Sequence, residues 1–113
     1  MSQDLVAYGK ALDARTAALF KAAPGPMRAF HQLVAEATKD GVLDAKIKEL
    51  MALAISVSLR CEGCIVYHTR AAFEKGASRE EVVETIAVAV EMGGGPAAVY
   101  GGQALAAYDQ HAR

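Results

Sequence analysis

The segment KELMALAISVSLRCEGCIVYHTRAA, residues 48–72, decides the fold of this chain. Apolar residues recur at helical spacing in its first part, and Asp44 just before it suits an N-cap, which predicts a helix over residues 45–59. Its second part predicts another helix over residues 61–75. Arg60 lies between the two, so we expect an antiparallel helix hairpin at the centre of the fold.

The chain on either side of this hairpin is also typical of helices. Apolar stripes separated by proline and glycine predict four more helices, over residues 3–22, 26–39, 78–93 and 96–110. Strand signals are scarce, because the β-branched runs AISVSL and TIAVAVEM each lie inside a longer segment with helical spacing. We therefore predict an all-α fold of about six helices, forming one domain over residues 1–113.

The composition favours self-association. Apolar residues make up 53% of the 113 residues, which is above the average for globular proteins, and tryptophan is absent. A chain this short keeps a large share of its surface exposed, so part of that apolar surface needs a partner. We expect a homo-oligomer.

Charge and hydropathy exclude several functions. The net charge is −1, and the 12 basic and 13 acidic residues form no basic stripe, so we expect no nucleic-acid partner. The first ten residues, MSQDLVAYGK, lack the basic start and apolar run of a secretory signal. The longest apolar stretch, residues 50–59, is far too short to span a bilayer. These features predict a cytoplasmic protein without a membrane partner.

Cys61 and Cys64 are the only cysteines, and they form a C-x-x-C motif. Residues three apart on a helix have Cα atoms roughly 5–6 Å apart, a separation that a disulfide can bridge. In a reducing compartment such a bond is transient and catalytic rather than structural. Both cysteines fall in the first turn of the predicted helix, where unpaired N–H groups and the helix dipole favour a thiolate.

Two further residues complete a candidate catalytic set. His68 follows Cys64 by four residues, on the same helix face, so its imidazole can take the thiol proton and return it later. In the expected hairpin, Glu49 lies about 16 Å back from Arg60 along one helix and His68 about 12 Å forward along the other. The two side chains should therefore meet, and Glu49 would orient and charge the imidazole.

Other interpretations of these residues exist. The cysteines could be two small buried residues, or could bind zinc together with His68, although the chain offers no recognisable fourth ligand. Haem attachment fails because Ile65 stands where a histidine is needed. We expect no metal, because the fourth zinc ligand is lacking, and no cofactor, because no glycine-rich phosphate loop follows a strand. His31 and His111 are interpreted as surface groups, and Tyr67 as a packing residue.

The pattern Glu49-x11-Cys61-x2-Cys64-x3-His68 resembles the signature of the alkylhydroperoxidase D / carboxymuconolactone decarboxylase superfamily. The surrounding sequence is similar over most of the chain. The resemblance implies an all-α protein that assembles as trimers or hexamers. Alkylhydroperoxidase D has a histidine immediately before its second cysteine, where this chain has Gly63.

The resemblance also implies a chemistry. In the thiol-bearing members the second cysteine attacks a peroxide and becomes a sulfenic acid, and the first cysteine condenses with it. Cys64 would then be peroxidatic, Cys61 resolving, His68 the base and Glu49 its partner. The leading hypothesis is a thiol-dependent peroxidase or disulfide reductase that cycles Cys61 and Cys64 between dithiol and disulfide, with a small-molecule hydroperoxide as substrate and an unknown thiol reductant. The alternatives are acid/base chemistry on a small lactone by His68 and Glu49, and a non-catalytic redox sensor.

Overall fold

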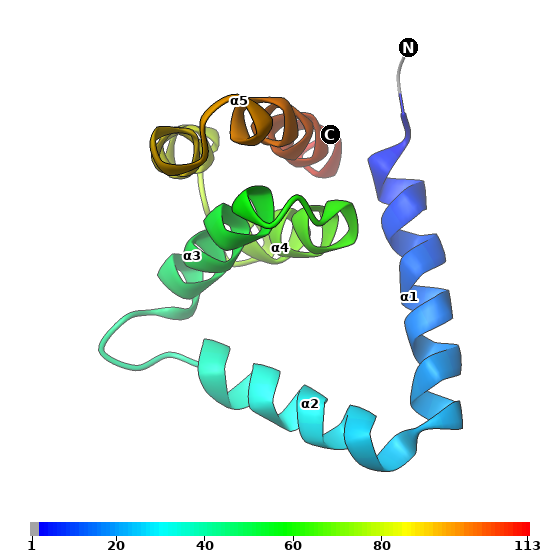
Figure 1. Ribbon diagram of the computed structural model, residues 1–113. Helices are drawn as coiled ribbons and strands as arrows, with labels where there is room; N and C mark the ends of the chain where they lie inside the picture. Colours follow the sequence, from blue (N-terminus) through cyan, green and yellow to red (C-terminus); the bar gives the residue numbers. More distant parts are fainter. Residues whose placement is uncertain (1–2) are drawn as a thin grey trace.

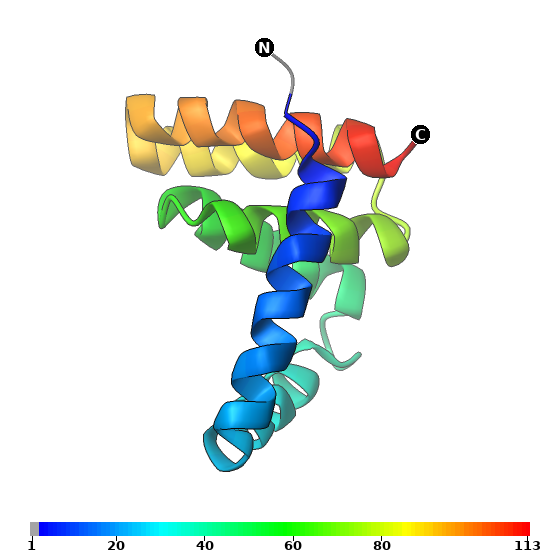
Figure 2. The same cartoon turned by 90° about the vertical axis from the view of Figure 1, so that its right-hand side faces the viewer.

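The structure, a computed structural model, describes residues 3–113 and is built from helices connected by short loops. The helices are α1 (Leu5–Ala22), α2 (Pro24–Thr38), α3 (Ala45–Ser58), α4 (Glu62–Glu74) and α5 (Arg79–His111). No strand occurs in the described range, so the predicted all-α class is confirmed. Helices α3 and α4 lie beneath α5, whereas α1 and α2 form a V that projects to one side (Figures 1 and 2).

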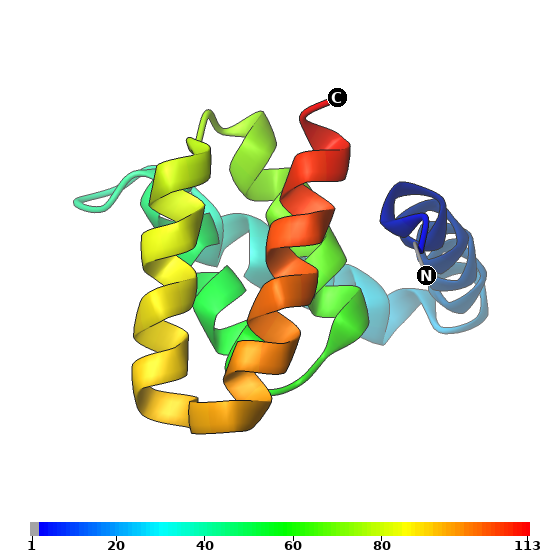
Figure 3. The ribbon, with the colours of Figure 1, turned by 90° about the horizontal axis from the view of Figure 1, so that it is seen from above.

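Helix α5 contains the last two of the six predicted helices, joined across a kink. It continues from Arg79 to His111 without a loop, but Gly94 has non-helical angles, with φ 67° and ψ −146°. The chain reverses there, so that two arms of one helix lie side by side above α3 and α4 (Figure 3). The predicted break and the two predicted helices on either side of it are therefore confirmed, and α5 comprises both.

The apolar character of α5 follows from its place in the fold. Its most apolar stretch has a mean hydropathy of 1.3, enough by length and composition for a membrane-crossing helix. The reversal at Gly94 makes each arm shorter than the roughly 20 residues that a span requires. Val82, Ala89 and Ala104 of α5 are buried and pack in the same core cluster as residues of α3 and α4. Helix α5 is therefore a core helix.

The core lies between the hairpin of α3 and α4 and the two arms of α5. Leu53 and Val57 of α3, Ile65 of α4 and Val82 of α5 are each completely buried. Small residues occupy most of the remaining core positions, which lets the helices approach closely. This core fixes the hairpin on which the candidate site is built.

Helix boundaries differ from the predicted ones by a few residues. Asp4 is the N-cap of α1, so this helix begins at Leu5 rather than at residue 3. Helix α2 begins at Pro24 instead of Pro26, because a proline without an N–H group also fits the first position there. Cys61 is the N-cap of α4 and not part of its first turn, because its side chain accepts a backbone hydrogen bond.

Gly101 and Gly102 lie next to each other in α5 but have opposite surroundings. A Cβ atom on Gly101 would lie 2.5 Å from Cγ2 of Ile86 on the other arm, whereas one on Gly102 would contact nothing within 4 Å. We expect Gly101→Ala to destabilise the protein by about 1–3 kcal/mol through overpacking. Gly102→Ala should stabilise it by up to about 1 kcal/mol, because alanine is the better helix former. Urea unfolding of the two variants measures both effects, and equal shifts in the same direction would contradict this packing.

His111 is not the plain surface group that its sequence position indicates. Its Nε2 atom is buried and has no hydrogen-bond partner among residues 3–113. Burial lowers the pKa of His111 below its ordinary 6.5, and the charge of Arg70 adds to this, while the Val66 backbone and Glu74 act in the opposite direction.

This burial makes folding sensitive to acid. A lowered pKa means that the unfolded chain binds the proton more readily, so stability is full above the ordinary pKa of His111 and falls as the pH drops below it. We expect His111→Gln to lose less thermal stability than the wild type between about pH 7 and pH 5. An unchanged dependence of the melting temperature on pH would contradict this.

Candidate active site

The Cys61–Cys64 disulfide stands at the start of α4. The two Cα atoms are 5.2 Å apart, within the range expected from the C-x-x-C spacing. The turn from α3 into α4 is tight, and Arg60 adopts a left-handed conformation there with φ 57°. Sγ of Cys61 accepts a hydrogen bond from the backbone N–H of Cys64 at 3.2 Å. The hairpin thus presents both sulfur atoms at one helix N-terminus.

Glu49 and His68 meet across the hairpin. Oε1 of Glu49 lies 2.7 Å from Nδ1 of His68, which is the contact that the hairpin geometry predicts. The Glu49 residue is only 6% exposed, so water screens this pair weakly. An ionised carboxylate can only accept, so Nδ1 donates its proton to Glu49 and Nε2 becomes the nitrogen that can bind a proton.

Tyr67 and Arg70 lie near His68 on α4 and contact one another. The ring of Tyr67 stands at 82° to that of His68, with centroids 4.9 Å apart, and the guanidinium of Arg70 lies 5.5 Å from the Tyr67 centroid. Arg70 in turn binds Asp13 of α1 at 2.9 Å, and this hydrogen bond raises the pKa of the guanidinium above its ordinary value. Tyr67 thus has the predicted packing role, and the ring it packs against is that of His68.

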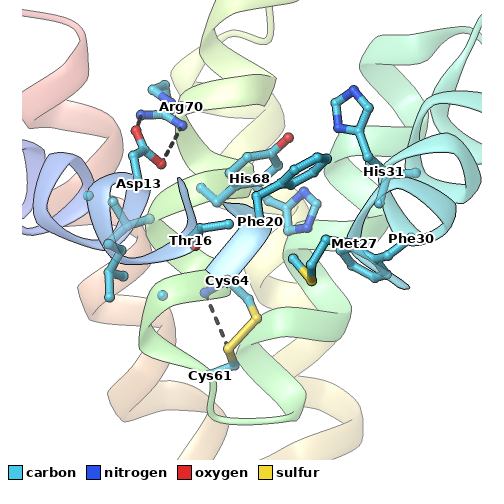
Figure 4. A pocket seen from close by; sticks show the side chains of 16 residues that line it. Asp13, Thr16, Phe20, Met27, Phe30, His31, Cys61, Cys64, His68 and Arg70 are labelled. Atoms are coloured by element: carbon cyan, nitrogen blue, oxygen red, sulfur yellow. Dashed lines mark hydrogen bonds and ion pairs between the residues drawn. A yellow bond between two sulfur atoms is a disulfide. The ribbon is translucent and has the colours of Figure 1, made fainter. Parts of the chain in front are cut away.

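A cavity of about 460 Å³ opens between α4 and the V of α1 and α2. The disulfide lies at one side of it and the Asp13–Arg70 pair at another (Figure 4). Cys61, Cys64 and His68 all line this cavity, whereas Glu49 lies behind His68. The other lining residues are mainly apolar: Gly9, Leu12, Thr16, Phe20, Met27, Phe30, His31, Val34, Gly63, Val66 and Tyr67, besides the charged pair.

Sequence reasoning missed the wall of this cavity that α1 and α2 supply. His31 is exposed, as predicted, yet it lines the cavity and lies edge-on to Phe20, with ring centroids 6.3 Å apart. Helix α2 has no buried residue at all, and its Phe30 is 58% exposed. The only sequence signal for this wall is the apolar stripe predicted over residues 26–39, which shows that the helix has an apolar face but not what that face covers.

Gly63 lies against Leu12 of α1. A Cβ atom at this position would lie 2.9 Å from Cδ1 of Leu12. A histidine in place of Gly63 would therefore require the end of the Leu12 side chain to shift. The absence of a side chain at Gly63 lets α1 pack directly on the redox motif.

Known proteins are similar to this chain in sequence and in fold. The sequence model of the carboxymuconolactone decarboxylase family matches residues 24–108. An uncharacterised protein of Cupriavidus necator is 40% identical over 109 residues, covering 96% of each chain. The crystal structure of the apo form of a carboxymuconolactone decarboxylase family protein from Legionella pneumophila has a TM-score of 0.95 and 39% identity, covering 99% of this chain and all of that one.

A second solved structure is similar over a smaller part. It is a carboxymuconolactone decarboxylase family protein from Thermotoga maritima, described as possibly involved in an antioxidative response, with a TM-score of 0.77 and 33% identity. The alignment covers 88% of this chain and 87% of that one. The C-x-x-C disulfide on this fold supports a redox-related role. By sequence match and by fold, this chain belongs to the carboxymuconolactone decarboxylase family.

Proposed function

We propose that this protein is a thiol-dependent peroxidase that reduces organic hydroperoxides by cycling Cys61 and Cys64 between dithiol and disulfide. The observation that carries the proposal is the position of the Glu49–His68 pair one helical turn beyond Cys64, beside an apolar cavity. A base held by a buried carboxylate next to a cysteine at a helix N-terminus is the arrangement that activates a thiol.

The oxidative half begins at Cys64. His68 takes the thiol proton, and the thiolate of Cys64 attacks the terminal oxygen of the hydroperoxide. The O–O bond breaks, the alcohol leaves with the proton from His68, and Cys64 becomes a sulfenic acid. The thiolate of Cys61 then attacks the sulfur of Cys64, a disulfide forms, and the hydroxide that leaves is protonated to water. Glu49 keeps Nδ1 of His68 protonated, so that Nε2 handles the moving proton.

The substrate and the electron donor follow from the cavity and the disulfide. A mainly apolar cavity of about 460 Å³ suits an alkyl or aryl hydroperoxide better than hydrogen peroxide. Reduction of the disulfide requires two electrons, which a thiol reductant supplies. A reducing compartment such as the cytoplasm maintains this cycle.

We further infer that the protein acts as a homo-oligomer, a trimer or a hexamer. Large apolar side chains remain exposed on several helices, including Leu33 at 64%, Ile55 at 57% and Met92 at 77%. An exposed apolar surface of this kind marks a protein interface. Light scattering after size exclusion should give a mass of three or six chains, and a monomer would contradict it.

Steady-state consumption of cumene hydroperoxide with dithiothreitol tests the enzymatic proposal. The wild type should complete many turnovers per chain, starting from fully reduced cysteines. Absence of turnover in the reduced wild type would contradict a peroxidase. Lactone-directed acid/base activity that survives loss of both cysteines would point instead to the decarboxylase chemistry, and stoichiometric oxidation without turnover would point to a sensor.

A further inference from the structure

The two sulfur atoms of the disulfide have different surroundings. Cys61 is the N-cap of α4, with the extended angles φ −103° and ψ 98°, and its Sγ accepts the N–H of Cys64. Cys64 lies inside the first turn, and no hydrogen bond reaches its Sγ from any residue between 3 and 113. The backbone therefore stabilises negative charge on one sulfur more than on the other.

This difference decides which sulfur leaves when the disulfide is opened. A thiolate attacks one sulfur of a disulfide and expels the other, and the better stabilised thiolate leaves faster. The N-cap sulfur receives an amide hydrogen bond and the positive end of the helix dipole. Cys61 is thus the better leaving group, and Cys64 is the sulfur to be attacked.

The cavity favours the same direction. The sulfur of Cys64 lies on the side of Met27 and His68, and that of Cys61 lies beyond it, at the far edge of the site (Figure 4). Attack on a disulfide sulfur proceeds in line with the bond that breaks. A thiolate that enters through the cavity therefore approaches Cys64 from the side opposite Cys61.

We infer that the reductant attacks Sγ of Cys64 and expels Cys61 as a thiolate held by the N–H of Cys64. The reductant sulfur bonds to Cys64, the Cys61–Cys64 bond breaks, and its electron pair goes to Cys61, so that no proton is required. The second thiolate of the reductant then attacks the reductant sulfur that is bonded to Cys64. This releases Cys64, which takes a proton through His68, and the reductant leaves as its disulfide, two electrons poorer.

This assignment deepens the proposed function and rests on it only for the peroxide half of the cycle. Cys64 would bond the peroxide oxygen in one half and the reductant sulfur in the other. Cys61 would bond only Cys64 in either half, and its thiolate would be ready each time for the sulfenic acid. The sulfur of Cys64, which lies nearer to Met27 and His68, thus performs all external chemistry.

Mapping the mixed disulfide tests this inference without any peroxide. Oxidised wild-type protein is treated briefly with 2-mercaptoethanol, quenched, alkylated with N-ethylmaleimide and digested with trypsin. Both cysteines fall in the peptide of residues 61–70, which fragmentation can resolve. We expect the mercaptoethanol adduct on Cys64 and the maleimide on Cys61, at least about 10 times more often than the reverse. An adduct mainly on Cys61, or evenly shared, would overturn the inference.

A second measurement does not depend on trapping. Absorbance at 240 nm follows the thiolate of each reduced single-cysteine variant as the pH is lowered. With His68→Gln in both variants, so that no imidazole stands beside Cys64, the Cys61 thiolate in Cys64→Ser should persist to lower pH than the Cys64 thiolate in Cys61→Ser, because only the first accepts the amide hydrogen bond. The reverse order would overturn the inference. Neither result depends on peroxidase turnover, so a failure of the proposed function leaves both tests readable.

Discussion

Replacing Cys64 with serine should reduce hydroperoxide turnover to the uncatalysed rate, a loss of at least about 1,000-fold, as is typical when a catalytic nucleophile is removed. A serine hydroxyl beside His68 is a far weaker nucleophile toward a peroxide oxygen than a thiolate, and it cannot form the sulfenic acid. The substitution exchanges one atom in a half-buried side chain, so the fold should persist. Initial rates with cumene hydroperoxide and dithiothreitol measure the effect.

Cys61→Ser is the matched control, because it removes the other sulfur of the same disulfide. This variant should still reduce one equivalent of peroxide per chain and accumulate a sulfenic acid on Cys64, which dimedone labels. Its steady-state rate should fall because no thiol remains nearby to resolve that acid. If Cys64→Ser turned over normally, or if Cys61→Ser lost even the first equivalent, the proposed order of events would be wrong.

The hairpin and its contacts could be predicted because they follow from local rules. Helical spacing and the N-cap at Asp44 define α3, and counting residues from Arg60 is enough to bring Glu49 opposite His68. The predicted break at residues 93–95 is also local, since three glycines interrupt helix formation. The reversal takes place at Gly94, and the two predicted helices lie on either side of it.

The cavity could not be predicted, because its walls depend on long-range packing. Asp13 reaches Arg70 across 57 positions in the sequence, and no periodicity links them. The apolar stripe of α2 is typical of a helix packed on a core, yet none of its residues is fully buried and its Phe30 lines the cavity. Hydrophobic periodicity reveals which face of a helix is apolar but not whether that face meets a core, a substrate or a second subunit.

Replacing Glu49 with glutamine should lower turnover by about 10- to 100-fold while the protein stays folded. The amide oxygen can still accept the N–H at Nδ1 of His68, so the ring keeps its orientation and its tautomer. What is lost is the negative charge, 2.7 Å from the ring, that stabilises the imidazolium after it takes the thiol proton. Initial rates and circular dichroism separate this effect from unfolding, and Glu91→Gln, which changes an exposed carboxylate, is the matched control.

The role of Glu49 as a partner of His68 sets an upper limit on this loss. A residue that acts only through the imidazole cannot contribute more than the imidazole itself, which general acid–base catalysis places at about 100- to 10,000-fold. The double variant Glu49→Gln/His68→Gln should therefore be no slower than His68→Gln alone. Independent losses that multiply in the double variant would mean that Glu49 touches the substrate or a thiol directly. In that case the 2.7 Å contact between Glu49 and His68 would serve the fold rather than the proton transfer.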